Sequence, residues 1–397
     1  TQGRVAGIKT SAGNLPCEMI IMAAGIRPNT EFLNDSGIEM FKGTILTDDQ
    51  MKTNLDDVYA AGDCVMVKNR LTGKRQWSPM GSSANLEGRT LAQVLAGAQK
   101  SYPGVLGTGV VKLPGLNAGR TGLTEAQAQK NKEQYGEKAG YDVVTALVPT
   151  DDKAHYYPDA SFFITKLIAD RSTRKLLGVQ VFGPGSVDKM VDIAVMGLNM
   201  GAVLDDFENA DFAYAPPFST AIHPFVQAVY VLMNKLDGTI VSMTPAEYAA
   251  GKAEGYTVVD VAPEPSIRGA VYVNLGAVNG EIKGLGKEEK LLLVCAKGKR
   301  GYFLQNRLRH YGYTNTVVLE GATFFNDVKV KNNIEEAVSK EDETRVKALG
   351  FLKDKRTPDK FNGRVITRNG KITAEEAHTI AEAAQLYGSG EVTMTSR

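Results

Sequence analysis

The amino-acid sequence predicts a multidomain protein that combines α/β and α+β folds. Two regions contain short apolar runs that end in Gly or Cys, a pattern typical of parallel strands buried on both faces. The region between them contains two strand-like segments followed by strongly apolar helices, which is typical of an α+β domain. A length of 397 residues allows more than two such domains.

Composition excludes several classes of function. The net charge of +1 gives no reason to expect a nucleic-acid or membrane partner. The three cysteines, Cys17, Cys64 and Cys295, have neither disulfide nor metal spacing, which favours a reducing cytoplasm and no metal site. The chain opens within a strand-like segment and stops at "GEVTMTSR", where the pattern of another strand begins. We therefore expect a fragment of a longer protein.

Residues 1–117 are expected to contain two buried parallel strands and one helix. The first strand is "EMIIMAAG", residues 18–25, and the second is "VYAAG", residues 58–62, which ends at Gly62 and Asp63. The helix is predicted to begin near Pro79 and Ser82, because proline is favoured in the first turn and serine at the cap.

Residues 118–238 are expected to form the α+β domain. "FFITKLIAD" and "KLLGVQVFG" predict two antiparallel strands joined by a turn. The segment "SVDKMVDIAVMGLNMG" predicts a helix, and a second apolar helix is predicted to follow Pro216 and Pro217. The first helix has one apolar stripe, formed by Val187, Met190, Val191, Ala194, Val195 and Leu198.

Residues 239–332 are expected to form a small parallel α/β domain. Its strands are "TVVDV", "AVYVNL", "LLLVC" and "TVVLE", separated by segments long enough for helices. Residues 333–397 are expected to contain a charged linker, a hairpin turned by Asn369 and Gly370, and a helix with a capping box at Thr373 and Glu376.

Cys295 is the strongest candidate for chemistry. It ends a predicted strand, and the loop "CAKGKR" leads into a helix whose buried side is expected to contain Phe303, Leu304, Leu308 and Tyr311. Such a loop can direct several backbone N–H groups at one centre beside a helix N-terminus, which favours an anion and the thiolate form of cysteine. Sulfurtransferases and cysteine phosphatases both use loops of this kind, and an inert buried cysteine is the structural alternative.

The six-residue loop resembles the C-x-x-G-x-R loop of the rhodanese family. The resemblance extends over about 90 residues, from "MTPAEYAA" to "LEGATFF". It implies that Cys295 carries a persulfide and that the loop binds an anion through Ala296, Lys297, Gly298, Lys299 and Arg300. Two positions depart from the family: Ala262 stands where an arginine is usual, and "SIRGA" has no histidine.

A second resemblance rests on "AAGIRPNT", "NLDDVYAAGDC" and "PMGSSANLEGR". Together they resemble the flavoproteins with two dinucleotide-binding domains, the FAD- and NAD(P)H-linked disulfide reductases. The resemblance implies FAD binding through Asp63 and, near the flavin, a helix N-terminus. The implied cofactor residues are Gly62, Asp63, Pro79, Gly81 and Ala84. Neither G-x-G-x-x-G fingerprint is present, so we expect the chain as given not to support flavin reduction by itself.

The segment "FAYAPPFSTAIHPF" is similar to the dimerisation domain of the CoA-disulfide reductase and NADH oxidase branch of these flavoproteins. The resemblance implies a homodimer in which Tyr214 lies near the partner subunit's active site. His223 is a second candidate catalytic residue, because histidine transfers protons near neutral pH. A histidine that caps a helix or packs at a subunit interface is the equally weighted alternative.

These resemblances imply five regions. Residues 1–30 would end an NAD(P)H-binding domain, 31–117 would be the C-terminal segment of an FAD-binding domain, 118–238 the dimerisation domain and 239–332 the rhodanese domain. Residues 333–397 resemble the start of a sulfite and nitrite reductase ferredoxin-like half-domain. The leading hypothesis is a reductase of CoA disulfide, CoA persulfide or polysulfide, with CoA thiols or sulfane sulfur donors as partners. The alternatives are an NADH oxidase with an independent rhodanese domain, and an inert docking module.

Overall fold

The computed structural model describes residues 3–135, 140–330, 351–353 and 361–363. The chain divides into two compact units, Thr1–Val330 and Lys331–Arg397. In the second unit the described residues form one antiparallel pair, β17 (Phe351–Lys353) with β18 (Phe361–Gly363). The expected linker, Asn369–Gly370 turn and capped helix lie outside the described residues. The mixed α/β and α+β fold class is confirmed.

The N-terminal segment, residues 3–108, contains a four-stranded sheet and one long helix. The hairpin β1 (Ile8–Thr10) and β2 (Gly13–Leu15) comes first. The sheet has the order β3-β4-β5-β6, with β3 at Met40–Phe41, β4 at Thr44–Leu46, β5 at Val65–Lys68 and β6 at Arg75–Trp77. A short 3-10 helix, η1, spans Glu31–Leu33, and α1 spans Gly81–Leu95, which confirms the predicted helix.

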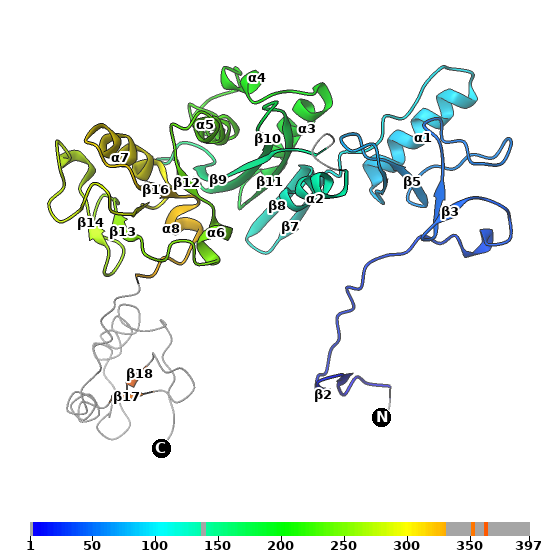
Figure 1. The fold of residues 1–397 in the computed structure, drawn as a ribbon. Coiled ribbons are helices and arrows are strands. Elements are labelled where there is room, and N and C mark those ends of the chain that lie inside the picture. The colour runs from blue at the N-terminus through cyan, green and yellow to red at the C-terminus, as the bar shows by residue number, and fades with distance from the viewer. Residues whose placement is uncertain (1–2, 136–139, 331–350, 354–360, 364–397) are drawn as a thin grey trace. The chain divides into compact units, whose positions relative to one another are not determined.

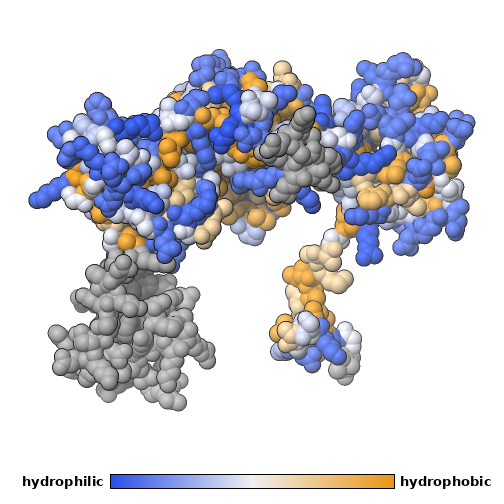
Figure 2. Space-filling model, viewed as in Figure 1, coloured by the Kyte–Doolittle hydropathy of each residue, from blue (hydrophilic) through white to orange (hydrophobic). Residues whose placement is uncertain are grey.

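Both strands expected in this segment require correction. Residues 18–25 form no strand, and the side chains of Met19, Ile21 and Met22 are 77%, 84% and 87% exposed, respectively; they contribute to the apolar surface of this segment in Figure 2. A doubly buried strand needs pairing strands and two covering layers, and no described residue supplies them. The run "VYAAG" makes one isolated bridge, between Lys52 and Tyr59, and the strand β5 begins only after Asp63.

The antiparallel domain, residues 109–236, is a five-stranded sheet covered by helices. Its order is β7-β8-β11-β10-β9, with bounds Gly109–Leu113, Leu116–Gly122, Leu176–Gly183, Phe162–Asp170 and Val143–Asp151, respectively. The predicted pairing of the two strands "FFITKLIAD" and "KLLGVQVFG" is confirmed. The sheet already includes Gly109–Leu113, which lies before the expected boundary at residue 118. The boundary itself stays a prediction.

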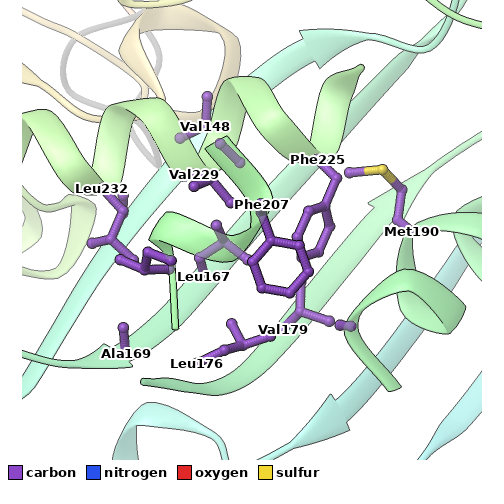
Figure 3. Close-up of a cluster of buried hydrophobic side chains, with 14 of the residues drawn as sticks. Val148, Leu167, Ala169, Leu176, Val179, Met190, Phe207, Phe225, Val229 and Leu232 are labelled. Carbon is purple, nitrogen blue, oxygen red and sulfur yellow. The ribbon is translucent and has the colours of Figure 1, made fainter. Parts of the chain in front are cut away.

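The described residues of the antiparallel domain form four helices (Figure 1): α2 at Glu125–Tyr135, α3 at Val187–Met200, α4 at Asp205–Glu208 and α5 at Pro224–Leu236. Helices α3 and α5 share one core with the sheet. In that core the Phe207 and Phe225 rings lie 5.1 Å apart, next to Met190 and Val179 (Figure 3). The predicted stripe of α3 is buried, apart from half-buried Val195.

Helix α5 begins at Pro224 and not after Pro217, which corrects the expected start. Pro216 and Pro217 instead form a turn. The residue before a proline is disfavoured in helical conformation, and His223 accordingly has φ −53° and ψ 139°. Pro224 then supplies the first helical residue, where its missing N–H costs nothing.

The parallel domain, residues 242–325, is a five-stranded parallel sheet of order β12-β16-β15-β13-β14. The strands span Ser242–Met243, Thr316–Leu319, Leu291–Val294, Thr257–Asp260 and Val271–Tyr272, respectively. Its helices are α6 (Pro245–Ala249), η2 (Leu275–Ala277), α7 (Lys299–His310) and α8 (Ala322–Phe325). The four predicted strands are confirmed.

The buried side of α7 differs in part from the prediction. Leu304 and Leu308 are fully buried, whereas Phe303 is 44% exposed and Tyr311 is half-buried. Gly301 and Gln305 complete the buried stripe. Gln305 was not expected there because it is polar, but its side chain hydrogen-bonds the backbone of Val241 and Thr316 and so fixes α7 on the sheet.

Candidate functional site

The thiol of Cys295 lies at the start of α7, where the sequence predicts it. Cys295 directly follows β15, and the residue is 3% exposed. The backbone N–H of Gly298 donates a hydrogen bond to Cys295 Sγ at 3.1 Å. Gly298 has φ +91°, which a residue with a side chain adopts only with strain, so glycine is needed to turn this N–H toward the sulfur. No side chain caps α7, and its N-terminal dipole therefore favours a negative charge at this point.

The three cations of the loop make different contacts. Arg300 Nε donates to the carbonyl of Val261 at 2.6 Å. The ammonium of Lys299 lies 5.8 Å from the centroid of the Phe303 ring. Lys297 forms an ion pair with Asp151, the last residue of β9 in the antiparallel domain. Residues 295–300 therefore connect β15 with the start of α7, as the sequence predicts. Within this loop, however, the side chains of Arg300 and Lys297 already bind other residues of the chain.

A second segment, residues 321–324, holds the loop from the other side. The backbone N–H of Thr323 donates to the carbonyl of Cys295 at 3.1 Å, and that of Phe324 donates to the carbonyl of Ala296 at 3.0 Å. Sequence reasoning did not assign these residues a role. The available signal was Gly321 two residues after the end of β16, because glycine at that place permits a turn with positive φ, here +73°.

Asp260, at the end of β13, stabilises the neighbouring loop that follows it. Burial by itself would raise the pKa of Asp260, but N–H groups of Ala262, Ser266 and Ile267 and the hydroxyl of Ser266 all donate to the carboxylate, and the net effect is a lowered pKa. The charged carboxylate thus organises residues 261–267, including Val261, whose carbonyl receives Arg300. Ala262 contributes only its backbone N–H to this arrangement.

The antiparallel and parallel domains contact each other beside the Cys295 loop. Glu320 accepts hydrogen bonds from Lys235 Nζ at 2.6 Å, Ser242 Oγ at 2.7 Å and the Leu147 N–H at 3.0 Å. The rings of Phe162 and Phe324 meet edge to face, with centroids 4.7 Å apart. These contacts place the end of β9 against the loop.

Tyr214 and His223 lie on the segment between α4 and α5. Tyr214 is 52% exposed. His223 is buried and caps α5, because its Nδ1 accepts a hydrogen bond from the Phe225 N–H at 3.2 Å. Burial, together with the charge of Lys189, lowers the pKa of His223 to about 4. The geometry gives His223 a structural role as a neutral cap; the catalytic roles predicted for both residues stay predictions.

The candidate flavin residues also gather in one place. Gly62 has φ +95°, and a Cβ added to it would lie 3.8 Å from Ala84 Cβ in the first turn of α1. Asp63 is exposed, and its carbonyl accepts a hydrogen bond from Trp77 Nε1 at 2.7 Å. Helix α1 begins at Gly81, after Pro79, with no side-chain cap and no acidic residue in its first turn.

These features fit the FAD that the resemblance implies. An exposed Asp63 carboxylate can accept hydrogen bonds from hydroxyl groups, and the uncapped end of α1 offers N–H groups and a positive dipole to an anionic ring. The positions of Pro79, Gly81 and Ala84 around this end agree with cofactor contacts, which stay proposed.

Sequence reasoning missed Glu87, which lies on α1 three residues after Ala84. Its carboxylate accepts the Gly62 N–H at 2.7 Å, and the residue is 1% exposed. Burial raises the pKa of Glu87 to about 7, with a smaller contribution from Asp63. The signal was its spacing of four residues from Ser83, which places both side chains on the buried face of the helix.

Other site classes find no support in the part of the chain that the structure describes. Within residues 3–135, 140–330, 351–353 and 361–363, no group of three His, Cys, Asp or Glu side chains could hold a metal ion. No helix in those same ranges is long and apolar enough to cross a membrane. Cys17 and Cys64 are free thiols, and burial raises the pKa of Cys64.

Comparison with known families finds matches for four regions of the chain. Residues 1–84 match the family described as pyridine nucleotide-disulphide oxidoreductase, and residues 110–225 match the dimerisation domain of that family. Residues 244–324 match the rhodanese-like domain. The chain thus combines segments similar to pyridine nucleotide-disulphide oxidoreductases with a segment similar to the rhodanese-like domain. The antiparallel domain is similar to the dimerisation domain of that family, and the parallel domain is similar to the rhodanese-like domain, and we call them by these names. Residues 353–397 match the nitrite/sulfite reductase ferredoxin-like half domain.

Similar proteins share this combination in part. The chain is 37% identical over 230 residues to the NAD(P)H coenzyme A polysulfide/persulfide reductase of Pyrococcus horikoshii, covering 58% of this chain and 50% of that protein. The solved NAD-dependent persulfide reductase from A. fulgidus superimposes with a TM-score of 0.71 at 30% identity, covering 78% of this chain and 56% of that one. CoADR-RHD from Bacillus anthracis gives a TM-score of 0.71 at 27% identity, over 80% and 57% of the two chains. The chain spans about half the length of these curated relatives.

Proposed function

We propose that the chain is part of a flavin-dependent NAD(P)H reductase of CoA disulfide, CoA persulfide or polysulfide, in which Cys295 carries sulfane sulfur. The observation that supports the sulfur-handling role is the hydrogen bond from the Gly298 N–H to Cys295 Sγ at the uncapped start of α7. The names of the similar reductases support the wider activity. The dimerisation-domain match supports a homodimer.

In the rhodanese-like domain, the chemistry is a transfer of one sulfur atom. The Cys295 thiolate attacks the outer sulfur of a donor such as thiosulfate, the S–S bond of the donor breaks, and sulfite leaves with the bonding electron pair. Cys295 then holds the sulfur as a persulfide, and no external oxidant or reductant is needed. The Gly298 N–H and the helix N-terminus stabilise the anionic sulfur before and after transfer.

In the oxidoreductase segment, the residues proposed to hold FAD are Gly62, Asp63, Pro79, Gly81 and Ala84. FAD, when bound, would supply hydride transfer between NAD(P)H and a disulfide. Gly62 keeps the turn close to α1, and Asp63 offers its carboxylate to cofactor hydroxyls. Tyr214 is exposed on the dimerisation domain and is proposed to assist at the thiol site of the assembled dimer.

The test measures sulfur uptake on Cys295 in a chain whose Cys17 and Cys64 are replaced by serine. After incubation with thiosulfate, intact-mass analysis should show the mass of one added sulfur. A further Cys295→Ser replacement should abolish the adduct without changing the circular dichroism spectrum. Absence of any adduct on Cys295 both with thiosulfate and with glutathione persulfide as the sulfur donor would refute the sulfur-carrying role.

A second candidate function is a flavoprotein whose rhodanese-like domain is an inert docking module. The observation that favours it is the 3% exposure of Cys295, together with the protein contacts of Lys297 and Arg300. In this case iodoacetamide should modify Cys295 only after denaturation. Modification in the native protein would exclude it.

A further inference from the structure

The Cys295 loop, residues 295–300 of the rhodanese-like domain, has a charged neighbour that belongs to the dimerisation domain. Asp151 ends β9, and its Oδ1 forms an ion pair with Lys297 Nζ. The two side chains are 37% and 34% exposed, respectively, so solvent reaches the pair but does not surround it. The sequence separation between the two residues is 146, and only the tertiary structure brings them together.

Asp151 changes the charge that the loop presents to an anion. Residues 295–300 carry three formal positive charges, on Lys297, Lys299 and Arg300. The carboxylate of Asp151 compensates the charge of Lys297, and the Nε of Arg300 is engaged by the Val261 carbonyl. A small dianion at Cys295 therefore meets less positive charge than the sequence of the loop indicates, and it also meets the negative charge of Asp151 itself.

The position of Asp151 is fixed by the structure around it. Asp151 pairs with Phe162 in the antiparallel sheet, and the ring of Phe162 packs on Phe324, whose N–H holds the Cys295 loop. The Lys235–Glu320 pair joins the same two domains nearby. An ion pair supported in this way differs from a mobile surface pair, which contributes little.

We propose that Asp151 is a specificity-determining residue of the Cys295 loop. Its carboxylate lowers the affinity of the loop for small dianionic donors such as thiosulfate, relative to persulfide sulfur carried on a larger thiol, whose reacting end carries a single charge. This inference rests on the proposed function, and it specifies the class of sulfur donor that the loop favours.

The first experiment removes the charge of Asp151. In the background with Cys17 and Cys64 replaced by serine, sulfate serves as an unreactive dianion that protects Cys295 from iodoacetamide. Asp151→Asn should strengthen this protection by ~3- to 30-fold, because loss of one nearby charge changes the binding of a dianion by that order. The KM for thiosulfate should fall by a similar factor, with kcat and the KM for glutathione persulfide changing less than about twofold.

A double-mutant cycle tests whether Asp151 acts through Lys297. Lys297→Met alone should weaken sulfate protection. Asp151→Asn should strengthen protection less in the Lys297→Met background than in the parent, because only the direct repulsion by Asp151 remains there. Asp159→Asn is the matched control. Asp159 belongs to the same domain as Asp151, but its carboxylate pairs with Lys153 at 2.7 Å and not with a residue of the Cys295 loop. This control should leave sulfate protection unchanged.

The outcomes separate the two proposals. Unchanged sulfate protection in Asp151→Asn, or an equal gain in Asp159→Asn, would overturn the role of Asp151. Failure of the parent protein to take sulfur from either donor would instead overturn the proposed function, while the sulfate measurement would still decide whether Asp151 controls anion binding at the loop.

Discussion

Glu320 and Lys235 form a buried ion pair between the rhodanese-like domain and the dimerisation domain. Glu320 Oε1 accepts from Lys235 Nζ at 2.6 Å, and the side chains are only 4% and 18% exposed, respectively. Lys235 also donates to the Thr145 carbonyl at 2.9 Å. The other oxygen of Glu320 accepts the Leu147 N–H, so both carboxylate oxygens and the ammonium group are hydrogen-bonded, and such bonds are what make a buried ion pair tolerable.

Replacing Glu320 by alanine should destabilise the contact between the two domains. The change leaves Lys235 charged and without its carboxylate, and we expect a loss of about 3 kcal/mol in the free energy of unfolding. Urea denaturation followed by circular dichroism measures this loss. Glu281→Ala is the control, because Glu281 pairs with Lys287 but is 73% exposed, and a change below about 0.5 kcal/mol is expected. Equal losses in both variants would contradict this explanation.

Replacing Gly298 by alanine should lower the reactivity of Cys295. Gly298 has φ +91°, so alanine strains the backbone and moves the N–H that contacts the sulfur. Gly312→Ala is the matched control: Gly312 has φ +86° in the same domain, away from Cys295, and its substitution meets only the Lys287 side chain. Both variants should lose about 1 kcal/mol of stability. Only Gly298→Ala should slow iodoacetamide modification at neutral pH; equal slowing would show that strain alone is responsible.

Glu87→Gln should make the N-terminal segment more stable at pH 8 than the parent. The pKa of Glu87 is raised to about 7, so folding favours the protonated carboxyl. Its contribution is fully present below the unfolded value near 4.5 and is lost as the pH rises to about 7. The gain in the variant should be on the order of 1–3 kcal/mol at pH 8 and vanish near pH 4.5.

Fluorescence can follow this change, because Trp77 is the single tryptophan of the chain and donates to the Asp63 carbonyl beside Gly62. Urea transitions of the parent and Glu87→Gln should therefore differ at pH 8 and coincide near pH 4.5. Transitions that differ equally at both values would show that the buried charge is not the cause.

His223 should make the dimerisation domain sensitive to acid. Its pKa is lowered to about 4 from 6.5, so its contribution to stability is present above pH 6.5 and is lost as the pH falls toward 4. His223→Asn keeps a cap acceptor and should remove part of this loss, whereas His223→Ala should cost about 1 kcal/mol at pH 7 through the missing cap. Hydrogen exchange of residues 223–236 measures both effects.

The exposed His155 provides the control for this experiment. His155→Asn should leave the exchange of residues 223–236 unchanged between pH 7 and pH 4.5. If His223→Asn retained the full acid sensitivity of the parent, titration of His223 would not be its source.

The strands of the antiparallel and parallel domains were predictable because their patterns are local. "FFITKLIAD" and "LLLVC" have the composition and length of buried strands, and both form where expected. The run at residues 18–25 has the same local pattern but no strand, because a strand also needs hydrogen-bonding neighbours. The predicted start of α5 was wrong because both Pro216-Pro217 and Pro224 can begin a helix. The non-helical conformation of His223 before Pro224 places the start at Pro224.

The sequence alone was enough to predict the class of the antiparallel and parallel domains and the place of Cys295 at the end of a strand, since each depends on residues adjacent in the chain. Only the tertiary structure decided which contacts surround the Cys295 loop. Asp151 reaches Lys297, and Glu320 reaches Lys235, across large sequence separations. Their charges interact because two domains pack together, and no local pattern encodes a contact whose partners lie on separately folded sheets.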